Sequence, residues 1–181
     1  STPEEAAGHR IVADAVHAAD PDVKICMQIL HSGPLAGTPA CVAPSAVKSR
    51  IGRFAPNELD EAGIEKQIAD FANCARLARE AGYDGVELIG SAGYLISTFL
   101  VRKTNLRTDR WGGEWENRMR FAVEVVKRVR AAIGPDAILI FRVPAMDMLD
   151  GGLAWDQVVS LARAVEAAGV PNAVVNAHYF A

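Results

Sequence analysis

A long glycine-rich segment holds the side chains of this chain that are best suited to chemistry. It begins with Gly90-Ser-Ala-Gly-Tyr94 and continues to Asn105-Leu-Arg-Thr-Asp-Arg-Trp-Gly-Gly-Glu-Trp-Glu-Asn-Arg118. Its glycines permit unusual backbone angles, its tyrosine offers a phenol, and its arginines can pair with anions or with neighbouring carboxylates. Because loops of this length inside a compact domain are usually functional, we expect a site here.

Polar side chains also occur inside apolar, strand-like segments. Gln28, Glu87 and Arg142 each lie in the second half of such a segment. If the strands are parallel, their carboxyl ends converge where a ligand binds. A structural alternative stays open, because Gln28 can be a satisfied core amide and Arg142 can simply pair with Glu87 on the adjacent strand.

The elements that must position these side chains alternate along the chain. Thr2-Pro3-Glu4-Glu5 is typical of a helix start, with Thr2 as N-cap and Glu5 completing a capping box, so we expect a helix to about residue 19. Apolar periodicity and turn residues predict the remaining elements. These are strands at 23–30, 85–89, 137–143 and 173–176, and helices at 64–81, 119–133 and 158–168.

This alternation predicts an α/β fold with parallel strands joined by helical crossovers. Two architectures fit, a (β/α)8 TIM barrel and an open doubly wound sheet. No Gly-x-Gly-x-x-Gly motif follows any predicted strand, so we favour the barrel. Only four of its eight strands are present, and residues 1–181 are therefore expected to form a single domain that is a partial barrel.

Composition excludes several classes of function. The chain has 181 residues and a net charge of −3, with 19 Lys and Arg against 22 Asp and Glu, which argues against nucleic-acid binding. No apolar run approaches the roughly 20 residues that span a bilayer, so we expect a soluble, cytoplasmic protein. Cys26, Cys41 and Cys74 show no metal-ligand spacing, which predicts free buried thiols and no metal site.

Five motifs spread over nearly the whole chain form a specific pattern. They are Met27-Gln-Ile-Leu-His-Ser-Gly33, Val42-Ala-Pro-Ser45, Ala81-Gly-Tyr-Asp-Gly-Val-Glu-Leu88, Gly90-Ser-Ala-Gly-Tyr-Leu95 and the run from Arg107 to Arg118. Together they resemble the old yellow enzyme family of FMN-dependent ene-reductases, and the Gly-Ser-x-Gly-Tyr form is most similar to the bacterial 2,4-dienoyl-CoA reductase branch. The resemblance implies that this chain is the central part of a TIM barrel that holds FMN.

The resemblance also implies roles for three residues. Gln28 would bond the pyrimidine edge of the flavin, and Arg142 would lie beside its N1 and O2 atoms and stabilise the reduced form. Hydride would pass from FMN N5 to an α,β-unsaturated thioester or carbonyl compound, an enoyl or enone substrate, and Tyr94 would donate the proton. NADPH or NADH would be the reductant, while an iron–sulfur cluster and FAD are possible only in parts absent from this chain.

Several positions depart from the family pattern. The residues that hold a substrate carbonyl in many family members fall on Ile89 and Ala92, and a family arginine is replaced by Pro34. The dienoyl-CoA branch has a catalytic histidine near the position of His178, but the surrounding sequence differs. His31 is expected to be structural, tying a strand end to a loop.

The run that ends at Arg118 is expected to be mostly scaffold. Trp111 would plug it, Asp109 would brace it by pairing with Arg118, and Glu116 and Arg120 stand at helical i,i+4 spacing.

Counterparts of the family's first two and last two strands are missing from these residues. The chain is therefore expected to be either a fragment of an enzyme or a half-barrel completed by a partner, by the missing half of the barrel or by a second copy of itself. The alternative to an ene-reductase is a non-catalytic half-barrel that binds no flavin. A different barrel enzyme is disfavoured, because neither a Schiff-base lysine nor a terminal phosphate loop can be identified.

Overall fold

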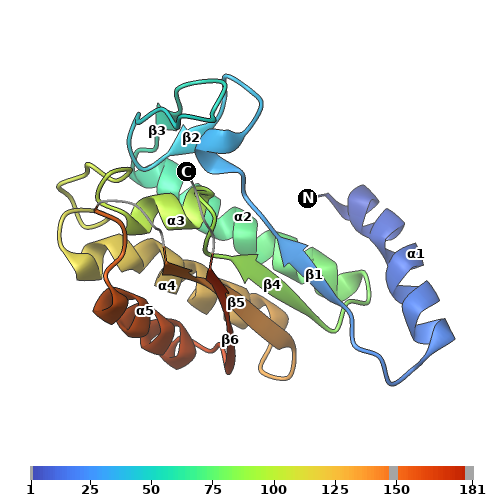
Figure 1. The fold of residues 1–181 in the computed structure, drawn as a ribbon. Helices are drawn as coiled ribbons and strands as arrows, with labels where there is room; N and C mark the ends of the chain where they lie inside the picture. The colour runs from blue at the N-terminus through green and yellow to red at the C-terminus, as the bar shows by residue number, and fades with distance from the viewer. Residues whose placement is uncertain (1, 147–150, 178–181) are drawn as a thin grey trace.

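A computed structural model describes residues 2–146 and 151–177 (Figure 1). Five α-helices and six strands occur in this part of the chain, together with a short 3-10 helix. In chain order they are α1 (Pro3–Ala19), β1 (Cys26–Ile29), η1 (Gly33–Leu35), β2 (Val42–Ala43), β3 (Asn57–Glu58), α2 (Glu61–Glu80), β4 (Gly85–Ile89), α3 (Leu95–Leu100), α4 (Trp115–Ile133), β5 (Ile138–Met146), α5 (Trp155–Ala167) and β6 (Asn172–Ala177).

The main sheet has the strand order β1-β4-β5-β6, and every neighbouring pair is parallel. Its strands are therefore spatial neighbours in the order in which they occur along the chain. Figure 1 shows α2, α4 and α5 together on one side of this sheet, with α2 packed on α4 and α4 on α5. A doubly wound sheet reverses its strand order and carries helices on both faces, so the arrangement is that of a barrel segment. The four strands do not close, which confirms a partial barrel.

Burial alternates along the strands and distinguishes the two faces of the sheet. In β5, Leu139, Phe141 and Val143 are almost fully buried, whereas Ile138, Ile140 and Arg142 are half-buried. The period of two assigns the buried set to the helix-covered face and the other set to the face left open. Val129 and Val126 of α4 and Ile68 of α2 are fully buried and belong to the same core.

The first helix begins as its sequence predicts. Thr2 accepts a hydrogen bond from the Glu5 backbone and Glu5 accepts one from the Thr2 backbone, which confirms the capping box. Burial of the cysteines differs from expectation, because Cys41 is buried whereas Cys26 and Cys74 are only half-buried. None of the helices described here is long and apolar enough to cross a membrane.

Besides η1, three elements occur where the sequence predicted loops. The short helix α3 interrupts the long segment after β4, and β2 pairs in parallel with β3 inside the stretch between β1 and α2. Every residue of α3 is buried, so the helix lacks the exposed face whose polar residues produce a helical period. Strands β2 and β3 have two residues each and are separated by the loop of residues 44–56. Such short strands, paired across a loop, leave no pattern of their own in the sequence.

Candidate active site

Gln28, Glu87 and Arg142 form one connected network across three adjacent strands. The Gln28 amide Nε2 donates to Glu87 Oε2 at 2.7 Å. The Arg142 guanidinium donates from Nε and Nη2 to Glu87 Oε1 at 2.8 and 2.6 Å. The structure thus confirms the pairing of Arg142 with Glu87 and adds Gln28 to it, so that one carboxylate orients both neighbours.

This network lies on the open face of the sheet. Gln28 is exposed, and the side chains of Arg142 and Glu87 retain 30% and 14% exposure. The Gln28 amide, which can both donate and accept hydrogen bonds, therefore lies near the Arg142 guanidinium on a face of the sheet that no described element covers. Such a donor set matches the edge of a flavin pyrimidine ring, which presents carbonyl oxygens, ring nitrogens and one N–H group. The residues present fit FMN at this position.

Tyr94 lies in the turn after the carboxyl end of β4, five residues beyond Ile89. It precedes α3 as its N-cap residue and is half-buried. Its carbonyl oxygen accepts hydrogen bonds from the Thr98 amide and from Ser97 Oγ, both at 3.0 Å. The tight turn that delivers it uses left-handed angles at Ala92 (φ 70°) and Gly93 (φ 73°). Because an alanine in this region is strained, the turn is held by its surroundings.

Tyr94 and the network belong to the same end of the sheet but to different elements. Among the described residues, none of the hydrogen bonds of Gln28, Glu87 or Arg142 involves Tyr94. The structure therefore brings the two predicted cofactor residues together and places the predicted acid on the neighbouring turn. His178, the other candidate acid, lies outside the described residues.

Trp111 fills the centre of the long segment, as predicted. It is 1% exposed, its indole Nε1 donates to Glu61 Oε2 at 2.6 Å, and its ring packs edge-on against Phe121. The hydrogen bond from this indole is the main reason that the pKa of Glu61 is lowered. Asn105 joins the segment to α3, because its Nδ2 donates to the carbonyls of Phe99 and Trp111 at 2.7 and 2.8 Å.

Asp109 does not brace Arg118, and this prediction was wrong. Asp109 instead pairs with Arg107 at 2.5 Å, and that hydrogen bond lowers the pKa of the Asp109 carboxyl. Arg118 is 2% exposed and donates to the carbonyls of Leu100 and Gly113. The buried guanidinium thus satisfies the Leu100 carbonyl, which the end of α3 leaves without a helical partner, and the Gly113 carbonyl before α4, as its five donors allow.

The predicted i,i+4 pair of Arg120 is also replaced by other contacts. Its guanidinium donates to the Arg110 carbonyl at 2.8 Å and to Asn117 Oδ1 at 2.9 Å. Arg120 thus ties α4 to the long segment through Arg110, and its partner within its own helix is Asn117 rather than Glu116.

His31 joins the end of β1 to η1, which confirms its predicted structural role. Its Nδ1 accepts a hydrogen bond from the Gly33 amide at 3.0 Å, so this nitrogen must be unprotonated. Desolvation by burial is the main cause of a lowered pKa for the imidazole. The folded chain therefore favours the neutral ring.

We expect the contribution of His31 to stability to be complete above about pH 6.5, the pKa of an unfolded histidine. As the pH falls below that value, the unfolded chain binds a proton before the folded one does, so the free energy of unfolding decreases towards the lowered folded pKa. Urea unfolding at several pH values in this range measures how steeply the free energy of unfolding depends on pH. This dependence should be weaker in the His31→Gln variant, and an unchanged dependence would contradict the role assigned to His31.

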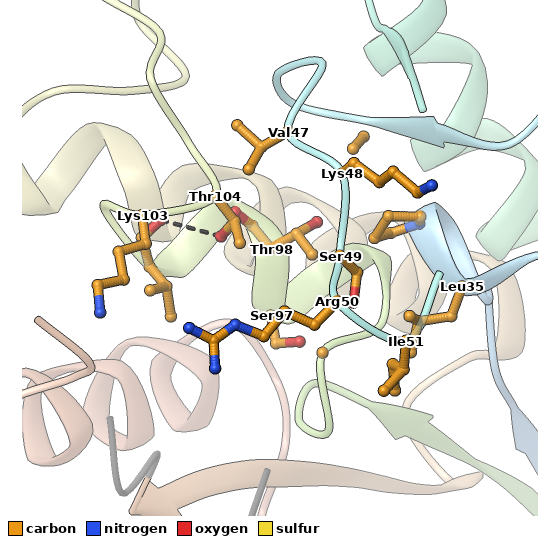
Figure 2. A pocket seen from close by; sticks show the side chains of 14 residues that line it. Leu35, Val47, Lys48, Ser49, Arg50, Ile51, Ser97, Thr98, Lys103 and Thr104 are labelled. Carbon is orange, nitrogen blue, oxygen red and sulfur yellow. Dashed lines mark hydrogen bonds between the residues drawn. The ribbon is translucent and has the colours of Figure 1, made fainter. Parts of the chain in front are cut away.

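A pocket that the sequence did not suggest borders the Tyr94 turn (Figure 2). Its volume is about 500 Å³, within the size range of small-molecule sites. It lies between α3 on one side and the loop from Val47 to Ile51 on the other, with Gly93 at its edge. Lys48, Arg50 and Lys103 line it. An acid-free basic stretch between residues 46 and 55 was the only sequence signal for it.

Known proteins with a similar sequence identify the family of this chain. The model of the NADH:flavin oxidoreductase / NADH oxidase family matches residues 2–177. A metal reductase of Desulforamulus reducens is 44% identical over 172 residues, which cover 92% of this chain and 25% of that protein. The chain thus spans a quarter of the length of this relative.

Solved structures agree with the sequence comparison. A 2-naphthoyl-CoA reductase in complex with 2-naphthoyl-CoA superposes with a TM-score of 0.85 and 33% identity, covering 97% of this chain and 29% of that one. Morphinone reductase in complex with tetrahydroNAD gives a TM-score of 0.84 and 29% identity, covering 97% of this chain and 54% of the other. The chain therefore belongs to the NADH:flavin oxidoreductase / NADH oxidase family, the old yellow enzyme flavoproteins, and its open sheet is part of their TIM barrel.

Proposed function

We propose that the complete protein is an FMN-dependent enzyme that uses NADPH or NADH to reduce the C=C bond of an α,β-unsaturated thioester or carbonyl compound. The observation that carries this proposal is the Gln28–Glu87–Arg142 network on the open face of the sheet, at the end where Tyr94 follows β4. Family membership supports the general chemistry. The resemblance to the 2,4-dienoyl-CoA reductase branch supports a thioester substrate.

Bound FMN would supply hydride transfer to the activated double bond. Gln28 and Arg142 would hold its pyrimidine edge, and the fixed charge of Arg142 would favour the anionic, reduced form. Glu87 acts through them as a positioning residue, since it takes one amide hydrogen of Gln28 and two guanidinium donors. Tyr94 would donate a proton to the carbon that collects negative charge, a general-acid role suited to a phenol.

Residues 1–181 are proposed to act as one partial-barrel domain of a larger, cytoplasmic assembly. The exposed edges of β1 and β6 leave backbone groups that need partners, so further strands or a second copy would complete the sheet. The alternative hypothesis, a non-catalytic half-barrel, predicts that the complete protein binds no flavin. Purification of the complete protein distinguishes the two hypotheses, because FMN absorbance that is retained after desalting excludes the non-catalytic one.

The proposed role of Arg142 is tested by the reduction potential of the bound flavin. Replacing Arg142 with Met removes a positive charge, so the potential should become more negative and FMN binding should weaken. Arg128→Met on α4 is the matched control, because this exposed arginine pairs with Glu65 on the helical layer. Equal potentials in the wild type and in Arg142→Met would show that Arg142 only supports the sheet.

A further inference from the structure

We propose that the pocket beside the Tyr94 turn binds the phosphate groups of a nucleotide-linked ligand. This inference rests on the proposed function, since the ligand would present its reactive part to Tyr94 and its charged part to the pocket. Two ligands of the proposed reaction share this chemistry, a coenzyme A thioester and the phosphorylated nicotinamide nucleotide. Their charged ends differ in the position of one phosphate, which makes them separable by experiment.

Charge is the first argument for an anionic ligand. Lys48, Arg50 and Lys103 contribute three cations to the lining, and none of the described lining residues is acidic. This local excess stands out in a chain whose net charge is −3. Lys48 and Arg50 make no ion pair with another described residue, in contrast to Arg107, which pairs with Asp109 and Glu58 nearby. Their charges are available for a ligand.

The placement of the cations suits a ligand with more than one phosphate. Figure 2 shows Arg50 reaching toward the side of the pocket where Lys103 lies, whereas Lys48 lies at the other end of the labelled group. An arginine can bond a phosphate through two parallel donors, and a lysine adds a point charge. The hydroxyl group of Ser49 lines the same space and can donate as well.

The loop that carries Arg50 is held in place. Its Gly52 amide donates to the Ser49 carbonyl at 3.2 Å, which closes a turn with Arg50 and Ile51 at its central positions. A Cβ atom at position 52 would lie 3.0 Å from the Pro34 carbonyl oxygen, a tight contact, so glycine favours the close approach of the turn to η1. The cation is therefore presented by a fixed turn, which lowers the entropy cost of binding.

The pocket continues toward the proposed acid. Gly93, the residue before Tyr94, belongs to the lining, and Ser97 donates from the pocket side of α3 to the Tyr94 carbonyl. Leu35, Val47 and Val101 add apolar walls to the same pocket. They suit the uncharged linker that separates a nucleotide from its reactive group.

Two small probes test the site without any reaction. Adenosine 3′,5′-bisphosphate represents the charged end of coenzyme A, and adenosine 2′,5′-bisphosphate represents that of the phosphorylated nicotinamide nucleotide. Calorimetry on the complete flavin-loaded protein should show binding of one of them. The double variant Lys48→Gln/Arg50→Gln should weaken that binding about tenfold or more, because charge-assisted hydrogen bonds to phosphate are lost. Lys127→Gln, which removes an exposed cation from α4, should leave it unchanged.

The outcomes are distinct. Binding of the first probe alone identifies the thioester as the ligand, and binding of the second identifies the reductant. If the wild type binds neither probe, or if Lys127→Gln weakens binding as much as the double variant, the proposal is overturned.

A kinetic comparison separates this inference from the proposed function. Crotonyl-CoA and the N-acetylcysteamine thioester of crotonate carry the same enoyl group, but only the former carries phosphates. If neither thioester is reduced although a probe binds, the proposed thioester activity is wrong and the proposed phosphate site remains supported. If both thioesters are reduced and the double variant changes neither probe affinity, the phosphate site is wrong and the proposed activity remains supported.

Discussion

Replacing Tyr94 with Phe is expected to slow reoxidation of the reduced enzyme by an enoyl substrate by about 10²–10⁴-fold, the usual contribution of a positioned general acid. The phenol oxygen is the only group that this substitution removes. Flavin reduction by NADPH needs no proton from that position, so its rate should stay close to that of the wild type. Stopped-flow measurement of the two half-reactions in the complete protein gives both rates separately.

Tyr83 provides the matched control for this experiment. Tyr83 is 6% exposed and precedes the start of β4. Its hydroxyl group forms a hydrogen bond of 3.1 Å with Nδ1 of His9 in α1. Tyr83→Phe therefore removes a phenol of the same chemistry from the opposite end of the strand and should spare both half-reactions. An equal loss in the two half-reactions of Tyr94→Phe would instead mean that Tyr94 shapes the site without donating the proton.

Replacing Trp111 with Ala is expected to cost about 3–5 kcal/mol of unfolding free energy, as for other fully buried aromatic residues. Trp111 holds the long segment against α2 and α4 through Glu61 and Phe121, and its carbonyl accepts from Asn105, which also binds α3. Loss of the indole ring leaves a cavity and removes the contacts with Glu61 and Phe121, while the backbone carbonyl that accepts from Asn105 remains. Thermal or urea unfolding of the complete protein measures the change.

Trp155 serves as the control for that substitution. It begins α5 and is 67% exposed, so Trp155→Ala should change the free energy of unfolding by no more than about 0.5 kcal/mol. A similarly small loss for Trp111→Ala would contradict the view that this residue is the central brace of the segment.

Local signals in the sequence were sufficient for much of the fold. The capping box of Thr2 and Glu5, the apolar stripes of α2 and α4, and the apolar runs of β4 and β5 depend on residues close to one another in the chain. Their alternation then restricts the topology, because parallel strands need helical crossovers. The family resemblance added the roles proposed for Gln28, Arg142 and Tyr94, which the half-reaction and potential measurements test.

Contacts between distant segments required the tertiary structure. Arg118 was expected to pair with Asp109, and only the folded segment shows that Arg118 turns inward to the carbonyls of Leu100 and Gly113. Helix α3 was missed because it is only six residues long and buried on every side, and periodicity detects helices that have one exposed, polar face.

The sequence by itself determined the alternating elements, the family and the candidate residues on the strand ends, because all of these follow from local pattern or motif. Only the tertiary structure decided that Glu87 joins Gln28 to Arg142, and that Lys48, Arg50 and Lys103 surround one pocket beside Tyr94. Register across parallel strands and the packing of a loop on a helix depend on residues tens of positions apart. No local pattern encodes that proximity.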